Sequence, residues 1–265
     1  MKYAFMTFSC PEATLGEALA LAKRFGYDGI EPRIGAGHHH GIEFDTPAAD
    51  RAAAARQAGE AGIALCCIAT SCRYADPALT SAMLDDTRRA VDLAADVGAP
   101  VIRVFGGKLG EGLSRDDAID LLAESLASVA DHAAERGVTL CVETHDDWCN
   151  PAHLVAALEK VNHPAVMANW DIMHPVRFAQ VPMAEAFETI KPWIRHVHFH
   201  DGAPAGEGYP LKPIGTGQID HAAAVTLLEA LDAEFYLSGE WIRWDEPYEV
   251  YLPRELATMK RYETR

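Results

Sequence analysis

Residues 134–142 read AERGVTLCV, which is an Ala-rich helix end, a glycine, and a run of apolar and β-branched residues. Gly137 can adopt the left-handed backbone conformation that ends many helices, and the run after it is typical of a buried strand. The same order of helix end, glycine and apolar run occurs three more times, at residues 22–31, 58–68 and 94–105. The chain is therefore expected to alternate helices with buried strands.

The apolar runs predict eight strands, near residues 2–9, 29–33, 64–71, 101–106, 139–145, 166–172, 196–201 and 234–241. They recur about every 33 residues, close to the length of one strand-helix unit. Strands that alternate with helices pair in parallel through right-handed crossovers. Eight such units predict an α/β fold of the (β/α)8 TIM-barrel type, as a single domain over residues 1–265. A doubly wound open sheet is the alternative, but the G-x-G-x-x-G turn after its first strand is absent.

Composition and charge exclude several classes of protein. The chain has 23 basic and 39 acidic residues, so its net charge is −16, which disfavours binding to nucleic acid. The apolar stretches are too short to span a bilayer, and residues 1–7 do not resemble a secretory signal. We expect a cytoplasmic protein with no membrane partner. Six cysteines without a C-x-x-C pair predict buried free thiols rather than disulfides.

Polar side chains that can bind metals follow four consecutive late strands. In strand order they are Glu143 and His145, then Asp171 and His174, then His196, His198, His200 and Asp201, and finally Glu240. Barrel enzymes carry their chemistry at these carboxyl ends of the strands. Three carboxylates and one imidazole form a mostly hard ligand set, suited to one Mn2+, Mg2+ or Co2+ ion, with Zn2+ as a further option. We predict that His198 is a ligand and that His196 is a supporting or structural residue.

The order of these motifs resembles a known family. Glu143, Asp171-x-x-His174, His196-x-His198-x-x-Asp201 and Gly-Glu240 together resemble the xylose isomerase-like TIM-barrel superfamily, as do residues 27–31 (YDGIE) and 213–220 (PIGTGQID). That superfamily includes sugar isomerases, ketose 3-epimerases, inosose and dehydroshikimate dehydratases, and endonuclease IV. The resemblance implies a metal held by Glu143, Asp171, His198 and Glu240, and a substrate-binding role for His174. It also implies a small sugar-like substrate and a homo-oligomer, either a dimer or a tetramer.

The sequence departs from some branches of the superfamily. Cys149 stands where ketose 3-epimerases carry a substrate-binding Glu, and residues 201–204 lack the Arg that usually follows their strand-seven His. The pattern Glu143-x-His145 and the basic residue His200 resemble more closely the dehydratase branch and the broad sugar phosphate isomerase/epimerase branch. Endonuclease IV-like members use additional His ligands that strands two and three do not provide here.

The resemblance and the residues lead to a chemical prediction. A divalent ion held by a carbonyl oxygen and a neighbouring hydroxyl acidifies the C–H bond between them. Glu143 and Glu240 are the predicted catalytic residues, one removing the proton and the other returning it, as in an isomerase or epimerase. Loss of a β-hydroxyl would instead make the protein a lyase of the inosose or dehydroshikimate dehydratase type. A metal-binding subunit without activity of its own is the non-enzymatic alternative.

Other residues have both a functional and a structural interpretation. His145, His200 and Arg103 are predicted to bind substrate, although Arg103 could equally form a salt bridge within the barrel. Glu31 has the same two interpretations, and Arg33 is expected to be structural. The segment His38–His40 is expected to be a solvated loop, with a lid as the alternative. Three tryptophans near the predicted ligands could stack on a sugar or pack in the wall: Trp170, Trp241 and Trp244.

Overall fold

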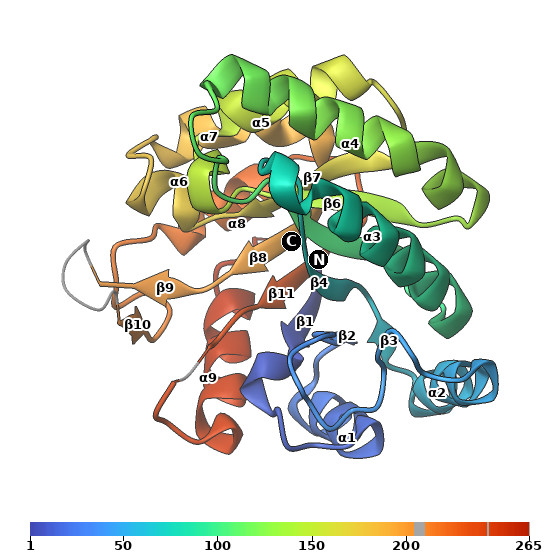
Figure 1. Cartoon of the computed structure of the whole chain (residues 1–265). Coiled ribbons are helices and arrows are strands. Elements are labelled where there is room, and N and C mark those ends of the chain that lie inside the picture. The colour runs from blue at the N-terminus through green and yellow to red at the C-terminus, as the bar shows by residue number, and fades with distance from the viewer. Residues whose placement is uncertain (204–209, 243, 265) are drawn as a thin grey trace.

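The computed structural model describes residues 1–203, 210–242 and 244–264. Its main sheet consists of parallel strands in the order β3-β2-β1-β11-β8-β7-β6-β5-β4, which curl into a barrel (Figure 1). The strands are β1 (Lys2–Met6), β2 (Gly29–Glu31), β3 (Ala64–Leu65), β4 (Ile68–Arg73), β5 (Val101–Phe105), β6 (Thr139–Glu143), β7 (Val166–Asp171), β8 (Ile194–Phe199) and β11 (Tyr236–Gly239). The predicted TIM barrel is confirmed.

The barrel closes where its third strand is interrupted. β3 pairs with β2, whereas β4 pairs with β5, so the two short strands together occupy one position of an eight-stranded barrel. Arg33 and Ala69 form a parallel bridge across the seam, and the Ala69 N–H donates to the carbonyl of Pro32. The continuous strand predicted at residues 64–71 is therefore wrong in this detail, because Cys66 and Cys67 leave the ladder between the two halves.

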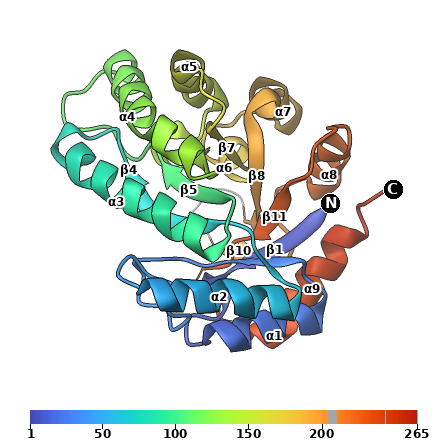
Figure 2. The ribbon, with the colours of Figure 1, turned by 90° about the vertical axis from the view of Figure 1, so that its right-hand side faces the viewer.

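Helices surround the strands and cover the outer face of the barrel (Figure 1). In the turned view, α2 lies between α1 and α3 (Figure 2). The helices are α1 (Leu15–Phe25), α2 (Ala48–Ala61), α3 (Pro77–Val97), α4 (Arg115–Glu135), α5 (Pro151–Val161), α6 (His174–Arg177), α7 (Met183–Ile190), α8 (His221–Glu229) and α9 (Tyr248–Lys260), with short 3-10 turns η1 (Thr7–Ser9), η2 (Asp146–Trp148) and η3 (Lys191–Trp193). Within the described ranges, no helix has both the length and the apolar character that crossing a membrane requires.

Local sequence signals explain where these helices begin and end. Thr14 and Glu17 form a capping box at the start of α1, so two backbone N–H groups that the helix leaves free are hydrogen-bonded. Asp76 caps α3 and is followed by a proline, a residue suited to the first helical position. Gly26 and Gly98 end α1 and α3 in the left-handed conformation, with φ of 85° and 80°. These glycines are two of those from which the sequence pattern was recognised.

A two-stranded antiparallel sheet extends the loop after β8. It consists of β9 (Asp201–Gly202) and β10 (Leu211–Lys212). The Asp201 carboxylate accepts hydrogen bonds from the backbone N–H groups of Gly202, Gly215, Gly217 and Ile219. Asp201 therefore anchors the glycine-rich turn at residues 213–220 rather than facing the ligand cluster. Of the stretch 201–204, Pro204 lies outside the described residues.

Alternation along the strands sorts the inside of the barrel into layers, because every second side chain points inward. Near the amino ends of the strands lies a small apolar cluster, here called the lower layer: Ala4, Cys66, Cys67, Val101 and Cys141. Near the carboxyl ends lies a charged set, here called the ionic layer: Glu31, Arg103, Glu143, Asp171, His196, His198 and Glu240. All of these side chains are buried. The six cysteines are free and buried, as predicted.

Candidate metal centre and active site

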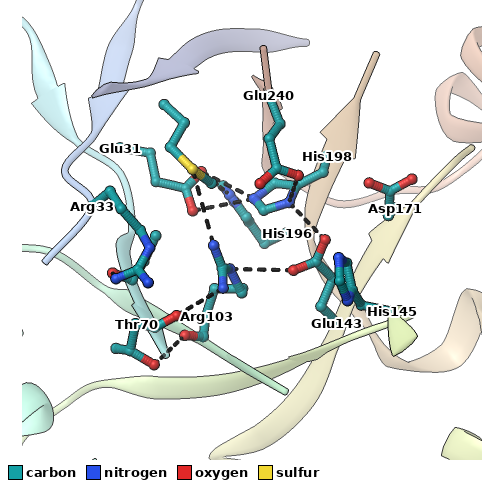
Figure 3. A network of polar contacts seen from close by, with 12 residues as sticks. Glu31, Arg33, Thr70, Arg103, Glu143, His145, Asp171, His196, His198 and Glu240 are labelled. Atoms are coloured by element: carbon teal, nitrogen blue, oxygen red, sulfur yellow. Dashed lines mark hydrogen bonds and ion pairs between the residues drawn. The ribbon is translucent and has the colours of Figure 1, made fainter. Parts of the chain in front are cut away.

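Four strands bring the predicted ligands together. Glu143 and Asp171 are the last residues of β6 and β7, His198 is the fifth residue of β8, and Glu240 directly follows β11. One potential ligand atom from each of these residues lies within 4.8 Å of those of the other three, and all four residues are buried. The predicted constellation is therefore assembled at the carboxyl end of the barrel (Figure 3).

His198 lies at the centre of this cluster. Its Nδ1 atom is 3.1 Å from Glu143 Oε1 and 3.5 Å from Glu240 Oε2. Burial alone would lower the pKa of His198, but Glu31 and Glu143 outweigh it and raise the pKa well above its usual value. Burial would raise the pKa of Glu240, yet His198 lowers it to about 2. The cluster thus attracts positive charge, either as a proton on His198 or as a bound cation.

Glu31 enters the same network from across the barrel. Its carboxylate lies 3.1 Å from His198 Nε2 and 2.9 Å from His196 Nε2 (Figure 3). Burial would raise the pKa of Glu31, but His198 and His196 lower it well below its ordinary value. The sequence identified Glu31 as a candidate without assigning its partners. His196 is thus linked to His198 through Glu31, and its supporting role stays a prediction.

Arg103 pairs with one of the predicted catalytic glutamates. Its Nε atom lies 3.2 Å from Glu143 Oε2, and Nη1 donates to the carbonyl of Thr70 at 2.8 Å. The guanidinium also lies over the ring of Phe105, 4.1 Å from its centroid. The side chain is only 1% exposed. Arg103 thus forms the barrel salt bridge that was one of its two interpretations, and contact with substrate stays a prediction.

A second group of histidines surrounds Asp171. Its Oδ1 atom accepts hydrogen bonds from the backbone N–H groups of Met173 and His174, while Oδ2 lies 2.9 Å from His200 Nε2. Burial would raise the pKa of Asp171, but His174 and His200 lower it well below its usual value. His174 and His200 thus lie beside the ligand cluster, where a substrate-binding role was predicted.

His145 lies at the rim of the site. Its side chain is 34% exposed, its Nδ1 atom is 3.2 Å from Asp146 Oδ1, and its ring centroid is 4.5 Å from that of His174. Burial would lower the pKa of His145, but Asp146 and Glu143 raise it to about 9. His145 is therefore partly exposed and packs beside His174, and its contact with substrate stays a prediction.

The donor set fits a divalent cation. Within the described residues, Glu143 Oε2 and Asp171 Oδ2 are buried and make no aligned hydrogen bond, although each lies near a cationic side chain. Buried carboxylate oxygens in this state are costly, and a shared cation would satisfy both. Three carboxylates and one imidazole favour Mn2+, Mg2+ or Co2+, while Zn2+ is also bound by such groups.

The solvated-loop interpretation of His38–His40 is wrong for His40. This residue is 4% exposed, and its Nε2 atom lies 3.1 Å from the carbonyl of Arg33, while Nδ1 accepts the N–H of Ile42. His38 Nδ1 is 3.0 Å from Thr7 Oγ1, and only His39 is exposed. Two of the three rings are therefore held by neighbouring segments: His40 by Arg33 and Ile42, and His38 by Thr7 of η1. Arg33 is structural as expected, since its guanidinium bonds the carbonyls of Ile34 and Ala69.

The tryptophans near the ligands pack in the wall. Trp170 and Trp241 are fully buried, against Phe187 and against Phe199 and Tyr251, respectively. Trp244 stacks on Tyr251, with ring centroids 4.8 Å apart. Trp170 directly precedes Asp171 on β7, so the two side chains point to opposite faces of the sheet. Trp241 and Trp244 follow the end of β11.

Comparison with known proteins defines the family. The family model for the xylose isomerase-like TIM barrel matches residues 19–262, so the chain belongs to this family. Among curated proteins, a 3-dehydroshikimate dehydratase from Bacillus anthracis is 23% identical over 158 residues, which span 53% of this chain and 55% of that protein. The match thus covers about half the length of that relative.

Solved structures with similar folds carry several activities in their names. The probable 3-DHS dehydratase AsbF from Bacillus anthracis has a TM-score of 0.81 and 18% identity, covering 98% of this chain and 99% of that one. The 3-keto-D-glucoside 4-epimerase from E. coli has a TM-score of 0.80 and 17% identity, covering 98% of this chain and 99% of that one. An L-ribulose 3-epimerase has a TM-score of 0.79 and 19% identity, covering 99% of this chain and 94% of that one. At these identities the likeness supports the shared barrel and does not select a reaction.

Proposed function

We propose that the protein is a divalent-metal-dependent isomerase or epimerase acting on a sugar-like polyol or keto substrate. One observation carries the proposal: Glu143, Asp171, His198 and Glu240 converge within 4.8 Å at the carboxyl end of the barrel. These four residues would hold the ion. When bound, it supplies positive charge that stabilises negative charge developing on a substrate carbonyl oxygen.

The chain's own residues would position the substrate and move its protons. Glu143 and Glu240 approach His198 from β6 and from the residue after β11, two strands on opposite sides of β8. They could therefore reach opposite faces of a substrate carbon, one removing a proton and the other returning it. His174 and His200, beside Asp171, and His145 at the rim would hydrogen-bond the substrate's hydroxyl groups.

The experiment follows hydrogen exchange at the substrate. Wild-type protein loaded with Mn2+ is incubated in D2O with a panel of keto sugars that includes L-ribulose and D-allulose, and deuterium incorporation next to the carbonyl is measured by NMR. Glu143→Gln and Glu240→Gln should each abolish incorporation while they keep the fold. Retained exchange in both variants would exclude the two-glutamate scheme. Absence of turnover across the panel and on 3-dehydroshikimate would favour the inactive metal-binding subunit.

A dehydratase is the second candidate, and a specific contact supports it. Arg103 Nε lies 3.2 Å from Glu143 Oε2, so one oxygen of Glu143 already has a cationic partner within the barrel. Elimination of a β-hydroxyl needs only one base for the C–H proton, so it does not require both glutamates to exchange protons with the substrate. The curated relative is also a dehydratase. With 3-dehydroshikimate, rising ultraviolet absorbance would indicate an aromatic product, whereas an epimerase would give exchange without absorbance.

A further inference from the structure

We propose that Glu31 is a positioning residue, which fixes the His198 ring so that its Nδ1 atom, and not Nε2, faces the metal centre. The two nitrogens of this ring lie in different surroundings. Nδ1 points toward Glu143 and Glu240, at 3.1 Å and 3.5 Å. Nε2 points the other way, 3.1 Å and 3.2 Å from the two carboxylate oxygens of Glu31 (Figure 3). The inference rests on the metal centre proposed above.

The chemistry of the contacting groups determines the hydrogen positions. An ionised carboxylate only accepts hydrogen bonds, so an imidazole nitrogen that contacts Glu31 must carry a hydrogen. When Nε2 of His198 is the protonated atom of a neutral ring, Nδ1 holds the lone pair that a metal requires. Ligating histidines commonly donate their other ring N–H to a carboxylate, which fixes the ring and strengthens the ligand.

Glu31 is itself held in place by a second histidine. His196 Nε2 lies 2.9 Å from Glu31 Oε2, and the three side chains are between 0% and 1% exposed. His196 and His198 are alternate residues of β8, with ring centroids 5.3 Å apart, so both face the barrel interior. The carboxylate of Glu31 on β2 thus contacts two rings of β8 and forms a clamp on them. In the sheet, β1 and β11 lie between β2 and β8.

The same three residues allow one competing arrangement. Glu31, His196 and His198 place ligand atoms within 4.8 Å of one another, so a cation could bind between them on the Nε2 side. In that arrangement Glu31 would be a ligand itself. The set has a single carboxylate, whereas the set on the Nδ1 side has three, and charge favours the latter for a hard divalent ion.

The test compares Mn2+ binding by purified wild-type protein, Glu31→Gln and a matched control, Glu43→Gln. The substituted Gln keeps the volume of Glu31 but has only one acceptor oxygen for the two rings. Glu43 accepts the N–H of Gly35 from the loop after β2 and contacts none of the ligands. Titration calorimetry should show Mn2+ affinity reduced about 10- to 100-fold in Glu31→Gln, which is the usual cost of losing such a partner. The control should match wild type.

A second readout reports the ring directly. Nitrogen-15 NMR of Zn2+-loaded wild-type protein should show a protonated Nε2 and a metal-bound Nδ1 for His198. A metal on Nε2, or wild-type Mn2+ affinity in Glu31→Gln, would overturn the inference while leaving the metal centre intact. No binding of any divalent ion by wild type would instead overturn the proposed function. If Glu31→Gln does not fold, His196→Asn releases half of the clamp, and unchanged Mn2+ affinity in that variant would also overturn the inference.

Discussion

The lower layer and the ionic layer are buried to the same degree but have opposite compositions. Cys67 and Cys141 of the lower layer are fully buried, and so are Glu31, Glu143 and Asp171 of the ionic layer. Burial of its apolar surface makes the lower layer stabilise the folded protein. Burial of the ionic layer removes its charges from water, and only pairing between opposite charges offsets this free-energy cost. Burial alone therefore does not explain why acidic residues line one end of the barrel, whereas the proposed binding of a cation would.

The ionic layer also shows how its charges are balanced. Of its four carboxylates, Glu31, Glu143 and Glu240 each lie within 3.5 Å of a ring nitrogen of His198, and Asp171 lies beside His200. Arg103 supplies a permanent positive charge next to Glu143. The permanent positive charges near the four buried carboxylates are too few to neutralise them. A divalent ion would supply the missing positive charge. The lower layer has no such demand.

A charge placed in the lower layer should have the largest effect. We expect Cys141→Asp to destabilise the fold by more than about 3 kcal/mol, because the new carboxylate would be buried among apolar groups without a partner. Urea unfolding measures the change, and Cys141→Ala, with a cost of about 1 kcal/mol, is its control. Equal stability of the two variants would show that the lower layer is open to water or to cations.

Removal of one charge from the ionic layer should affect binding more than folding. Asp171→Asn should weaken Mn2+ binding by more than about 100-fold, since it removes a proposed direct ligand rather than a supporting partner. Calorimetric titration gives the affinity. Asp131→Asn is the control because Asp131 is 95% exposed. An Asp171→Asn variant that binds Mn2+ normally would contradict the proposed ligand set.

Metal binding itself should stabilise the protein through the ionic layer. At a free Mn2+ concentration 100 times its dissociation constant, the free energy of unfolding should rise by about 2.7 kcal/mol relative to protein treated with chelator. Urea unfolding with and without Mn2+ measures this difference. Asp171→Asn at the same Mn2+ concentration should gain much less. An equal gain in both proteins would place the stabilising ion elsewhere.

The sequence predicted most of the ionic layer but not its internal contacts. Glu143, Asp171, His198 and Glu240 could be found because parallel strands bring their carboxyl ends together, so position along each strand is sufficient. The contact of Glu31 with His196 and His198 could not be derived, because it joins residues 165 and 167 positions apart. Such a contact depends on the diameter and stagger of the closed barrel, which no local pattern contains. The burial of His40 could not be predicted for a related reason. Its partner is the backbone carbonyl of Arg33, and a backbone group carries no sequence signal.

Truncation of a lower-layer side chain should separate stability from binding most clearly. Val101→Ala removes two methyl groups from a residue that is 3% exposed, and we expect a loss of about 1–3 kcal/mol from reduced apolar burial and the cavity left behind. Mn2+ affinity should stay at the wild-type value, because no ligand and no contact of Glu31 involves Val101. Unfolding and Mn2+ titration of the same preparation test both parts. A loss of affinity parallel to the loss of stability would show that packing in the lower layer sets the ligand geometry above it, and the two layers would then have to be treated as one functional unit.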